Sequence, residues 1–333
     1  MGLNVMCLSF EHPIKKHNLF SRVTIRIYRG SAPIPALHDG SVATIGNFDG
    51  VHQGHQMLLA QLCARANRLQ LPSLVVLFEP QPAEYFLGDQ APVRLFSFRE
   101  KIHALQQAGV DAVYCCRFNA HLASLSPAAF AEQVLFSLLR VKHLLLGQDF
   151  RFGQGRLGDT AALKKLGDAR QCVVEVCPDY PTDQTRVSST EIRLALREGN
   201  LQQAALYLGR PYTVSGRVIR GFGRGRQWGI PTANVHIPHG VLPLRGVFFV
   251  QVRRANGAVF SGVANVGCRP TLNGNQTSLE VHLLDMEASL YGERIAVTFL
   301  CKWRDEMKFA SVDLLITQIK QDIREAKSYF ALL

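Results

Sequence analysis

Between residues 41 and 208, short apolar runs alternate with segments of helical periodicity. The apolar runs predict buried strands at Ser41–Ile45, Ser73–Phe78, Ala112–Cys116, His143–Gly147 and Cys172–Cys177. The helical segments are Gln56–Arg68, Phe98–Ala108, Pro127–Arg140 and Asp159–Asp168, followed by one joining helix over residues 188–208. Apolar strands that alternate with helices predict a doubly wound parallel sheet. In such a sheet, ligands bind at the carboxyl ends of the strands.

After about residue 212, apolar and polar residues alternate with the period of two that is typical of strands. The predicted strands are Tyr212–Arg220, Asn234–Ile237, Val247–Arg253, Val259–Ala264, Leu279–Leu284 and Arg294–Leu300. An amphipathic helix follows from about Val312 to Phe330, with Ser311 as its expected cap. Several short strands and one closing helix predict a small β-barrel. The chain is therefore expected to form an α/β domain followed by a β domain.

The composition fits two globular domains and narrows the choice of partners. The chain has 333 residues, of which 47% are hydrophobic, and a formal net charge of +11, which suits anionic partners. Because the basic residues form no block, a small anionic ligand fits them better than a nucleic-acid duplex. No apolar run is long enough for a membrane span. The cysteines form no CxxC pair, which predicts reduced thiols and a cytoplasmic location.

The first chemical signal is the segment Gly46–His55, which follows the first predicted strand and opens the first predicted helix. Its glycines let the backbone approach a ligand closely, and a helix N-terminus favours phosphate groups. His52 and His55 are three residues apart, so they share one helical face. The segment predicts a triphosphate site that stabilises the charge developing during nucleotidyl transfer. The plainer alternatives are a turn with two surface histidines and a metal site with two ligands.

This segment resembles the HxGH signature of nucleotidylyltransferases, and in full it resembles the FMN adenylyltransferase half of bacterial bifunctional FAD synthetases. Phe78–Pro82, Gly147–Gly153 and Ser188–Arg193 carry the same resemblance. It implies that His52 and His55 are catalytic. The ATP contacts that it implies are Gly46, Asn47, Phe48, Asp49, Gly54, Ser188, Ser189, Thr190 and Arg193. The flavin contacts that it implies are Phe78, Pro80, Pro82, Asp149, Phe150 and Phe152.

Some of these residues also have a physical interpretation of their own. Ser188 and Glu191 have the spacing of a capping box, and Arg193 can make a bidentate contact with phosphate. A helix cap alone is the alternative. The aromatic residues suit an apolar slot for a flavin ring, although such residues more often belong to a core. Gln81 stands where many relatives carry His, and Asp149 where others carry Asn, so these departures concern the flavin contacts and not the phosphate-binding residues.

A second signal begins at the glycine-rich stretch Gly221–Gly229, which matches neither a Rossmann fingerprint nor a Walker loop. Thr232 and Asn234 follow two residues apart on a predicted strand, so both side chains face one way and can reach Mg²⁺ and phosphate together. Glu280 alternates with apolar neighbours and is expected to point off the core, with Gly262–Thr271 before it as a loop-like ligand candidate. A carboxylate near Mg-bound ATP can take a proton from an attacking alcohol. The alternatives are a flexible turn and an ordinary exposed strand charge.

The segments Pro231–Asn234, Gly262–Thr271 and Leu279–Asp285 resemble, in this order, the riboflavin kinase module, and Lys308–Ser311 extends the match. The resemblance implies Glu280 as the base on the ribityl 5′-hydroxyl. It implies ATP and Mg²⁺ contacts at Gly221, Gly225, Arg226, Pro231, Thr232 and Asn234, with Thr232 and Asn234 at the metal. The expected divisions are an unmatched extension (1–23), an FMN adenylyltransferase domain (24–187), a linking helix (188–208) and a riboflavin kinase domain (209–333).

The two resemblances predict one bifunctional enzyme of flavin cofactor biosynthesis. It would phosphorylate riboflavin to FMN with ATP and Mg²⁺, and then join AMP from a second ATP to FMN, giving FAD and pyrophosphate. The expected partners are riboflavin, FMN, FAD and ATP, without nucleic acid or membrane, and the oligomeric state stays open. One alternative is a nucleic-acid-binding protein, because HxGH-type sites also occur in tRNA-charging enzymes. Another is a protein with one active half and one flavin-binding regulatory half.

Overall fold

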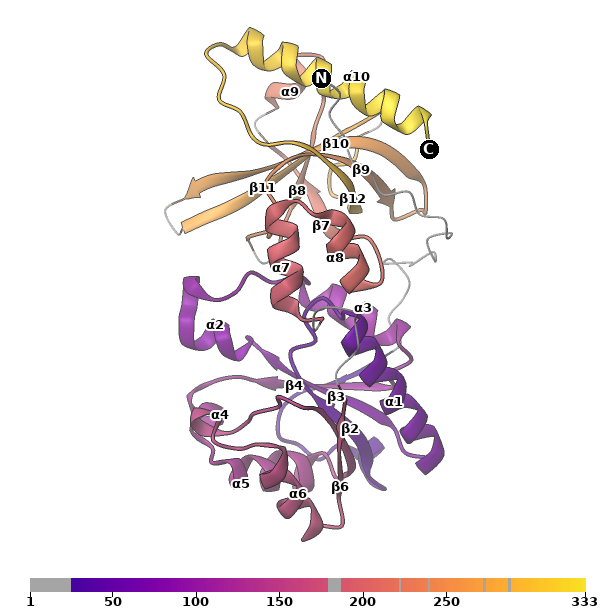
Figure 1. Cartoon of the computed structure of the whole chain (residues 1–333), viewed down its shortest axis with the longest axis vertical. Helices are drawn as coiled ribbons and strands as arrows, with labels where there is room; N and C mark the ends of the chain where they lie inside the picture. The colour runs from indigo at the N-terminus through magenta and orange to yellow at the C-terminus, as the bar shows by residue number, and fades with distance from the viewer. Residues whose placement is uncertain (1–24, 179–186, 222, 239, 272–273, 287–288) are drawn as a thin grey trace. The chain divides into compact units, whose positions relative to one another are not determined.

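The computed structural model describes residues 25–178, 187–221, 223–238, 240–271, 274–286 and 289–333. The expected extension at residues 1–23 lies outside this part of the chain. The chain forms two compact units (Figure 1). The first unit comprises residues 25–92 and Phe98–Ser188, and the second comprises Val93–Ser97 and Ser189–Leu333.

The first unit is built on a six-stranded parallel sheet with the strand order β1-β4-β3-β2-β5-β6. Its strands are β1 (Arg26–Tyr28), β2 (Ser41–Ile45), β3 (Ser73–Glu79), β4 (Ala112–Arg117), β5 (Val141–Gly147) and β6 (Val173–Cys177). From β2 the chain adds β3 and β4 on one side, whereas β5 and β6 lie on the other. The strand order therefore reverses between β2 and β5, which is where doubly wound sheets bind ligands.

Helices bury both faces of this sheet. They are α1 (Gln53–Leu69), α2 (Pro82–Leu87), α3 (Phe98–Gln107), α4 (Ala120–Ser124), α5 (Pro127–Phe130), a π-helix (Ala131–Leu138) and α6 (Thr160–Asp168). Leu135 of the π-helix and Leu163 of α6 share one core with Ala43, Leu74 and Leu144 of the sheet. Because successive strand residues point to opposite faces, the remaining buried residues of the strands face the other side, where α1 contacts β2, β3 and β5. This explains why the inner strands are largely apolar, whereas β6 at the edge of the sheet is mostly exposed or partly buried, so the prediction of a buried strand over Cys172–Cys177 is wrong for its middle residues.

The segment 188–208 forms two helices, α7 (Ser189–Glu198) and α8 (Leu201–Leu208), so the prediction of one joining helix is wrong. Gly199 adopts a φ of 79°, which ends α7. Asn200 then caps α8, because its side chain accepts a hydrogen bond from the Gln203 N–H at 3.0 Å. The predicted helix Pro127–Arg140 is confirmed as one continuous helical segment, in which α5 passes directly into the π-helix and helical structure ends at Leu138. The strand β1 and the helices α2 and α4 are too short to produce a periodic pattern.

The second unit contains a closed barrel, which confirms the predicted small β-barrel. Its strands are antiparallel and have the order β10-β11-β8-β7-β12-β9. Its strands are β7 (Thr213–Ile219), β8 (Ala233–His236), β9 (Gly246–Arg254), β10 (Val259–Thr271), β11 (Gly274–Leu283) and β12 (Arg294–Arg304). A short helix, α9 (Arg224–Gln227), lies in the glycine-rich stretch, and α10 (Val312–Ala331) ends the chain. The fold class predicted from the sequence is confirmed in both units.

The segment Gly262–Thr271 is not a loop but the last ten of the thirteen residues of β10, a strand that the sequence predicts to end at Ala264. A Cβ on Gly262 would lie 2.6 Å from the His282 carbonyl oxygen, and a Cβ on Gly267 would lie 2.6 Å from Glu306 Oε1. These glycines therefore allow other groups to approach the strand closely. From the sequence alone, the same glycines predict a loop.

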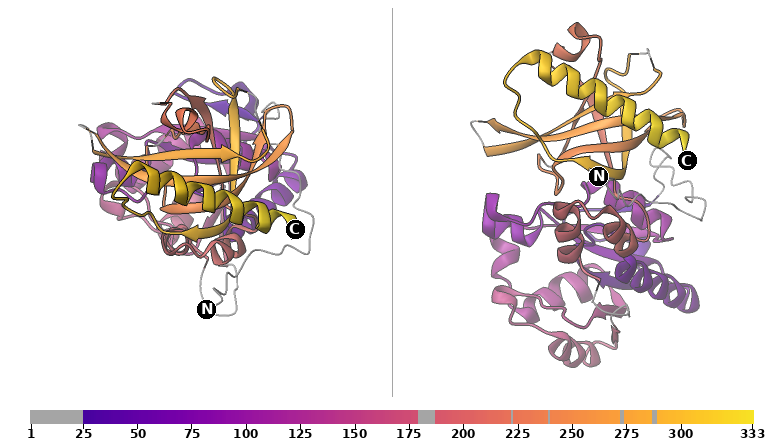
Figure 2. Two further views of the ribbon diagram at one scale, coloured as in Figure 1. Left: turned by 90° about the horizontal axis from the view of Figure 1, so that it is seen from above. Right: turned by 45° about the horizontal axis from the view of Figure 1, so that its top comes forward.

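The helix α10 runs along the outside of the barrel (Figure 2) and contacts β10. Ser311 caps it, because its Oγ accepts a hydrogen bond from the Leu314 N–H at 3.3 Å. The C-terminal half packs on the barrel through Ala326, which shares a core with Val247 and Phe249. The N-terminal half is more exposed, and a cavity lies between it and the strands.

In the part of the chain that the structure describes, no helix is long and apolar enough to cross a membrane. Among the side chains that the structure describes, Cys63, Cys115, Cys116, Cys172, Cys177 and Cys301 are free cysteines. Burial is the largest cause that raises the pKa of the Cys116 thiol to about 12 and of the Cys172 thiol to about 11. These two thiols therefore stay protonated at neutral pH.

Candidate active sites

The segment Gly46–His55 follows β2 at the carboxyl edge of the sheet and starts α1. His52 is the N-cap of α1, and its Nδ1 accepts a hydrogen bond from the His55 backbone N–H at 3.3 Å. Because Nδ1 accepts this bond, neutral His52 carries its proton on Nε2. The imidazole can therefore donate from Nε2 to an anion at the start of the helix, where the dipole of α1 also favours negative charge.

His55 lies in the first turn of α1 and is held in the neutral form. Its ring stacks on that of His52, with centroids 3.6 Å apart, and lies 4.8 Å from the ring of Phe48. Burial, together with the nearby charges of His52 and Lys101, lowers the pKa of His55 well below its ordinary value of 6.5. His55 Nδ1 is buried without a hydrogen-bond partner among the described residues, which leaves a polar atom that a ligand can satisfy.

The backbone before α1 is strained. Phe48 and Val51 have φ values of 46° and 41°, although neither is glycine, and Gly50 between them has a φ of 78°. The non-glycine residues Phe48 and Val51 each cost of the order of 1–3 kcal/mol in this conformation, and such conformations concentrate at ligand-binding loops. Phe48 and Asp49 are almost fully buried, which holds the loop in this shape.

A cavity of about 630 Å³ opens beside this loop in the first unit, and we call it the aromatic cavity. Its lining includes residues from the ends of β2, β3 and β5. These three strands are neighbours in the sheet. The predicted site residues that line it are Gly46, Asn47, Phe78, Pro82, Asp149, Phe150 and Phe152. Pro80 is not part of the lining. Gln81 is buried instead at the start of α2, where its N–H donates to the Glu84 carboxylate at 2.8 Å.

Sequence reasoning missed part of the aromatic cavity, namely Phe86, Leu87, Phe118 and Phe130. The rings of Phe78 and Phe118 meet edge to face with centroids 5.9 Å apart. Phe86 is 64% exposed at the cavity, on the short helix α2. The apolar run Tyr85–Leu87 was the available signal, since an exposed aromatic helix face needs an explanation.

The motif Ser188–Arg193 is divided between the two units. Ser188 ends the first unit, whereas Ser189, Thr190 and Arg193 belong to α7 of the second unit. Within the second unit, Arg193 Nε donates a hydrogen bond to the Val93 carbonyl oxygen at 2.5 Å.

In the second unit, a cavity of about 150 Å³ lies between the glycine-rich stretch and β8, and we call it the glycine-loop cavity. The predicted residues that line it are Gly221, Gly225, Arg226, Pro231, Thr232 and Asn234. A Cβ on Gly221 would overlap the side chain of Asn234, and a Cβ on Gly225 would overlap the Ile230 carbonyl oxygen. Glycine therefore lets the loop lie directly on the strand. Sequence reasoning missed Met286, Ser289, Leu290 and Tyr291 in the lining.

A second cavity of the barrel, of about 350 Å³, lies between the strands and α10, and we call it the helix cavity. Glu280 lines it from β11, directly opposite Asn234 on β8 and Asn265 on β10. Its neighbours Leu279 and Val281 are buried in the barrel, whereas Glu280 is only partly buried. Thr232 lines both the helix cavity and the glycine-loop cavity, so the two cavities adjoin at this residue.

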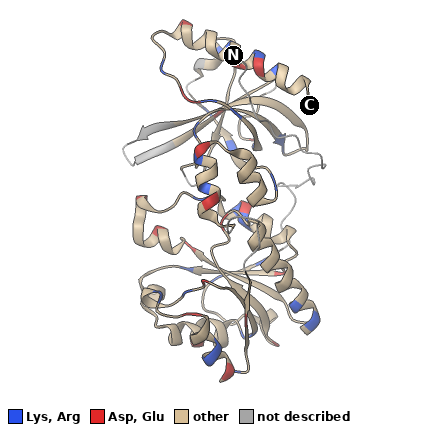
Figure 3. Ribbon diagram, viewed as in Figure 1, with Lys and Arg blue, Asp and Glu red and all other residues tan. Residues whose placement is uncertain are grey.

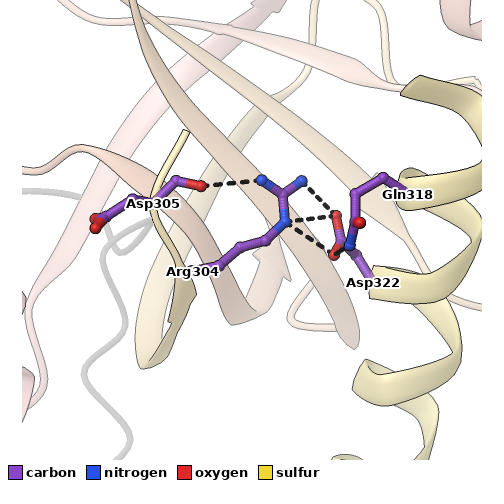
Figure 4. Close-up of polar contacts among 4 residues, drawn as sticks. All are labelled: Arg304, Asp305, Gln318 and Asp322. Carbon is purple, nitrogen blue, oxygen red and sulfur yellow. Dashed lines mark hydrogen bonds and ion pairs between the residues drawn. The ribbon is translucent and has the colours of Figure 1, made fainter. Parts of the chain in front are cut away.

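An ion pair connects the barrel to α10 at the wall of the helix cavity (Figure 4). Arg304 Nε lies 3.0 Å from Asp322 Oδ1, and an Arg304 terminal nitrogen lies 2.7 Å from Asp322 Oδ2. The Asp322 side chain is only 3% exposed. Gln318 Nε2 also donates to Asp322 Oδ1 at 2.9 Å, and the Asp305 carbonyl oxygen accepts from Arg304 at 2.9 Å. This network fixes α10 against the end of β12.

Asp322→Ala is expected to reduce the free energy of unfolding of the second unit by about 3–5 kcal/mol, because it leaves the Arg304 cation largely buried without its partner. Both tryptophans of the chain, Trp228 and Trp303, lie in the second unit, so tryptophan fluorescence during urea unfolding reports on that unit. Asp313→Ala, in the exposed first turn of α10, is the control and should cost less than about 1 kcal/mol. Equal losses in the two variants would contradict this role of the pair.

Two family profiles match the chain, one in each half. The family described as FAD synthetase matches residues 34–191, and the family described as riboflavin kinase matches residues 208–330. A bifunctional riboflavin kinase/FMN adenylyltransferase from Haemophilus influenzae is 44% identical over 306 residues, which are 92% of this chain and 99% of that protein. A protein of the same name from Escherichia coli strain K12 is 45% identical over 297 residues, which are 89% of this chain and 95% of that protein.

A solved structure from Streptococcus pneumoniae has a similar fold, with a TM-score of 0.77 and 29% sequence identity. The matched region covers 91% of this chain and 99% of the chain in that structure, which bears the name macrolide-efflux protein. Both the fold and the sequence comparisons therefore extend over both units of the chain.

Proposed function

The chain belongs to the family of bifunctional riboflavin kinase/FMN adenylyltransferases, and from this premise we propose how its residues carry out the two reactions. The enzyme transfers the γ-phosphate of ATP to riboflavin, which gives FMN and ADP. It then joins AMP from a second ATP to FMN, which gives FAD and pyrophosphate. The second unit, with its riboflavin kinase match, carries out the first reaction, and the first unit carries out the second.

The observation that supports the kinase site most strongly is that its two cavities adjoin at Thr232. We assign ATP to the glycine-loop cavity and riboflavin to the more apolar helix cavity. The Glu280 carboxylate takes the proton of the ribityl 5′-hydroxyl while that oxygen bonds to the γ-phosphorus and the bond to ADP breaks. Glu280 lies opposite Asn234 in the strand ladder, which supports assigning Glu280 as a base that acts beside the phosphates.

The oxygen atoms of Thr232 and Asn234 fit a magnesium site. Mg²⁺ prefers hard oxygen ligands and binds through few protein groups, keeping positions for phosphate and water. Thr232 and Asn234 are two residues apart and both line the glycine-loop cavity. Bound Mg²⁺ would neutralise charge on the phosphates. The protein's own contribution is to position the phosphates beside the Glu280 carboxylate.

Adenylyl transfer in the first unit needs no protein nucleophile. An oxygen of the FMN phosphate attacks the α-phosphorus of ATP, and pyrophosphate leaves. His52 donates from Nε2 to the phosphates, and the N-terminus of α1 contributes the positive end of its dipole. His55, neutral at pH 7, supports the His52 ring by stacking. The aromatic cavity accepts the flavin ring, which its size and its phenylalanine side chains suit.

The distribution of charge supports small anionic substrates rather than nucleic acid. On α10 the basic residues Lys320, Arg324 and Lys327 are interspersed with Asp313, Asp322 and Glu325, and both signs are visible along this helix in Figure 3. Interspersed charges do not make the basic stripe that phosphate-backbone binding needs. We therefore propose riboflavin, FMN, FAD and ATP as the partners, and the free thiols suit a cytoplasmic location.

A time course tests this function directly. Purified protein is incubated with riboflavin and Mg-ATP, and the flavins are separated by chromatography. We expect FMN to appear first and FAD later. FMN alone would contradict the adenylyltransferase assignment and would implicate Gln81 and Asp149, the two departures at the flavin contacts. Binding to RNA that weakens steeply with salt, with no flavin product, would instead favour the nucleic-acid alternative.

A further inference from the structure

We infer that His282 is a positioning residue of the riboflavin kinase site, which holds the wall between the two barrel cavities through a hydrogen bond to Pro231. This inference rests on the proposed kinase site. His282 lies on β11 two residues after Glu280, so the two side chains share one face of the strand, and both line the helix cavity.

The bond itself joins β11 to the segment just before β8. His282 Nδ1 lies 2.8 Å from the Pro231 carbonyl oxygen. A carbonyl oxygen can only accept, so Nδ1 carries the proton and donates it. Pro231 has no N–H with which to continue the strand ladder. The imidazole therefore adds a connection beyond Val281 and Ala233, the last residues that pair between β11 and β8.

The same segment is held from its other side by the glycine-rich stretch. The Ile230 N–H donates to the Gly225 carbonyl oxygen at 2.8 Å. A Cβ on Gly225 would also lie 3.3 Å from Thr232 Oγ1, so the loop passes close to this hydroxyl. Residues 230–232 are thus bonded to the loop at one end and to His282 in the middle. Loss of the imidazole would release one of these two attachments.

Thr232 is the residue whose position this arrangement controls. It lines both cavities and directly follows Pro231, whose carbonyl the imidazole holds. A shift of this segment moves the Thr232 hydroxyl relative to Asn234 and to the bound phosphates. The helix cavity keeps its apolar walls on the barrel and on α10. His282 is therefore expected to affect the use of Mg-ATP much more than the binding of riboflavin.

The test compares His282→Leu, which has no donor, with His282→Asn, whose side-chain amide can donate from nearly the position of Nδ1. We expect His282→Leu to raise the KM for Mg-ATP in riboflavin phosphorylation by about tenfold, which corresponds to one hydrogen bond. The KM for riboflavin should stay within about twofold, and His282→Asn should recover most of the loss. His236→Leu removes an exposed histidine of the neighbouring strand β8 and should leave both constants unchanged.

Two outcomes would overturn the inference. Either both His282 variants keep the wild-type KM for Mg-ATP, or both lose equally, so that the donor does not matter. FAD formation from FMN is measured in the same samples and should be unaffected. Glu280→Gln, assayed in parallel, separates the inference from the proposed function. An inactive Glu280→Gln with a normal His282→Leu refutes only the positioning role, whereas a fully active Glu280→Gln refutes the proposed base.

Discussion

His52→Ala is expected to abolish FAD formation while FMN formation from riboflavin continues at the wild-type rate. His52 caps α1 through Nδ1, and we assign its Nε2 as a donor to the phosphates, so alanine removes both the cap and that donor. Loss of one donor that stabilises developing charge costs about 10²–10³ in rate. Loss of the cap costs about 1 kcal/mol of stability. The kinase residues all lie in the other unit, so the variant should affect only one of the two reactions.

The two roles of His52 can be separated with asparagine. Asparagine is a good N-cap but has no group in the place of Nε2, so His52→Asn should fold like the wild type and still fail to make FAD. FMN with ATP, and riboflavin with ATP, are assayed separately. His121→Ala, an exposed histidine of the first unit, is the control and should keep both activities. Full FAD formation by His52→Asn would remove His52 from catalysis.

The fold could be predicted wherever a pattern extended over many residues. The strand Ser41–Ile45 has the predicted bounds, and α10 differs from the predicted helix by one residue. The errors arise where one residue overrides the pattern. Gly199 and Asn200 divide the predicted joining helix, although the apolar periodicity continues across them. The glycines of β10 have the composition of a loop, but they lie where another strand or side chain approaches closely.

The candidate sites could be predicted only as far as their residues form local motifs. The glycine-rich stretch and Pro231–Asn234 are close in sequence, so all of their predicted contacts line one cavity. Phe86 and Leu87 were missed although they follow Pro82 closely, but other missed residues come from distant segments that the fold brings together. Phe118 reaches the aromatic cavity from the loop after β4, and Asp322 reaches the helix cavity from α10. No spacing along the chain indicates such contacts, because they depend on strand order and helix placement.

Glu280→Gln is expected to stop FMN formation from riboflavin but to leave the conversion of FMN to FAD intact. The substitution keeps the size of the side chain on β11 and removes only the group that accepts the proton. General base catalysis contributes about 10²–10⁴ in rate, so kcat should fall by that factor. Binding of riboflavin should change little, since the apolar walls of the helix cavity are untouched.

The helix cavity supplies the matched control for this variant. Glu306 also lines the cavity, but it follows β12 and does not lie opposite Asn234 in the ladder. Glu306→Gln should therefore keep kcat within about threefold if position in the ladder, and not charge in the cavity, makes Glu280 the base. Single-turnover assays with riboflavin and Mg-ATP measure this step, and FMN with Mg-ATP tests the other unit in the same preparation. Equal losses in the two variants would mean that the cavity needs negative charge rather than a base beside the phosphates.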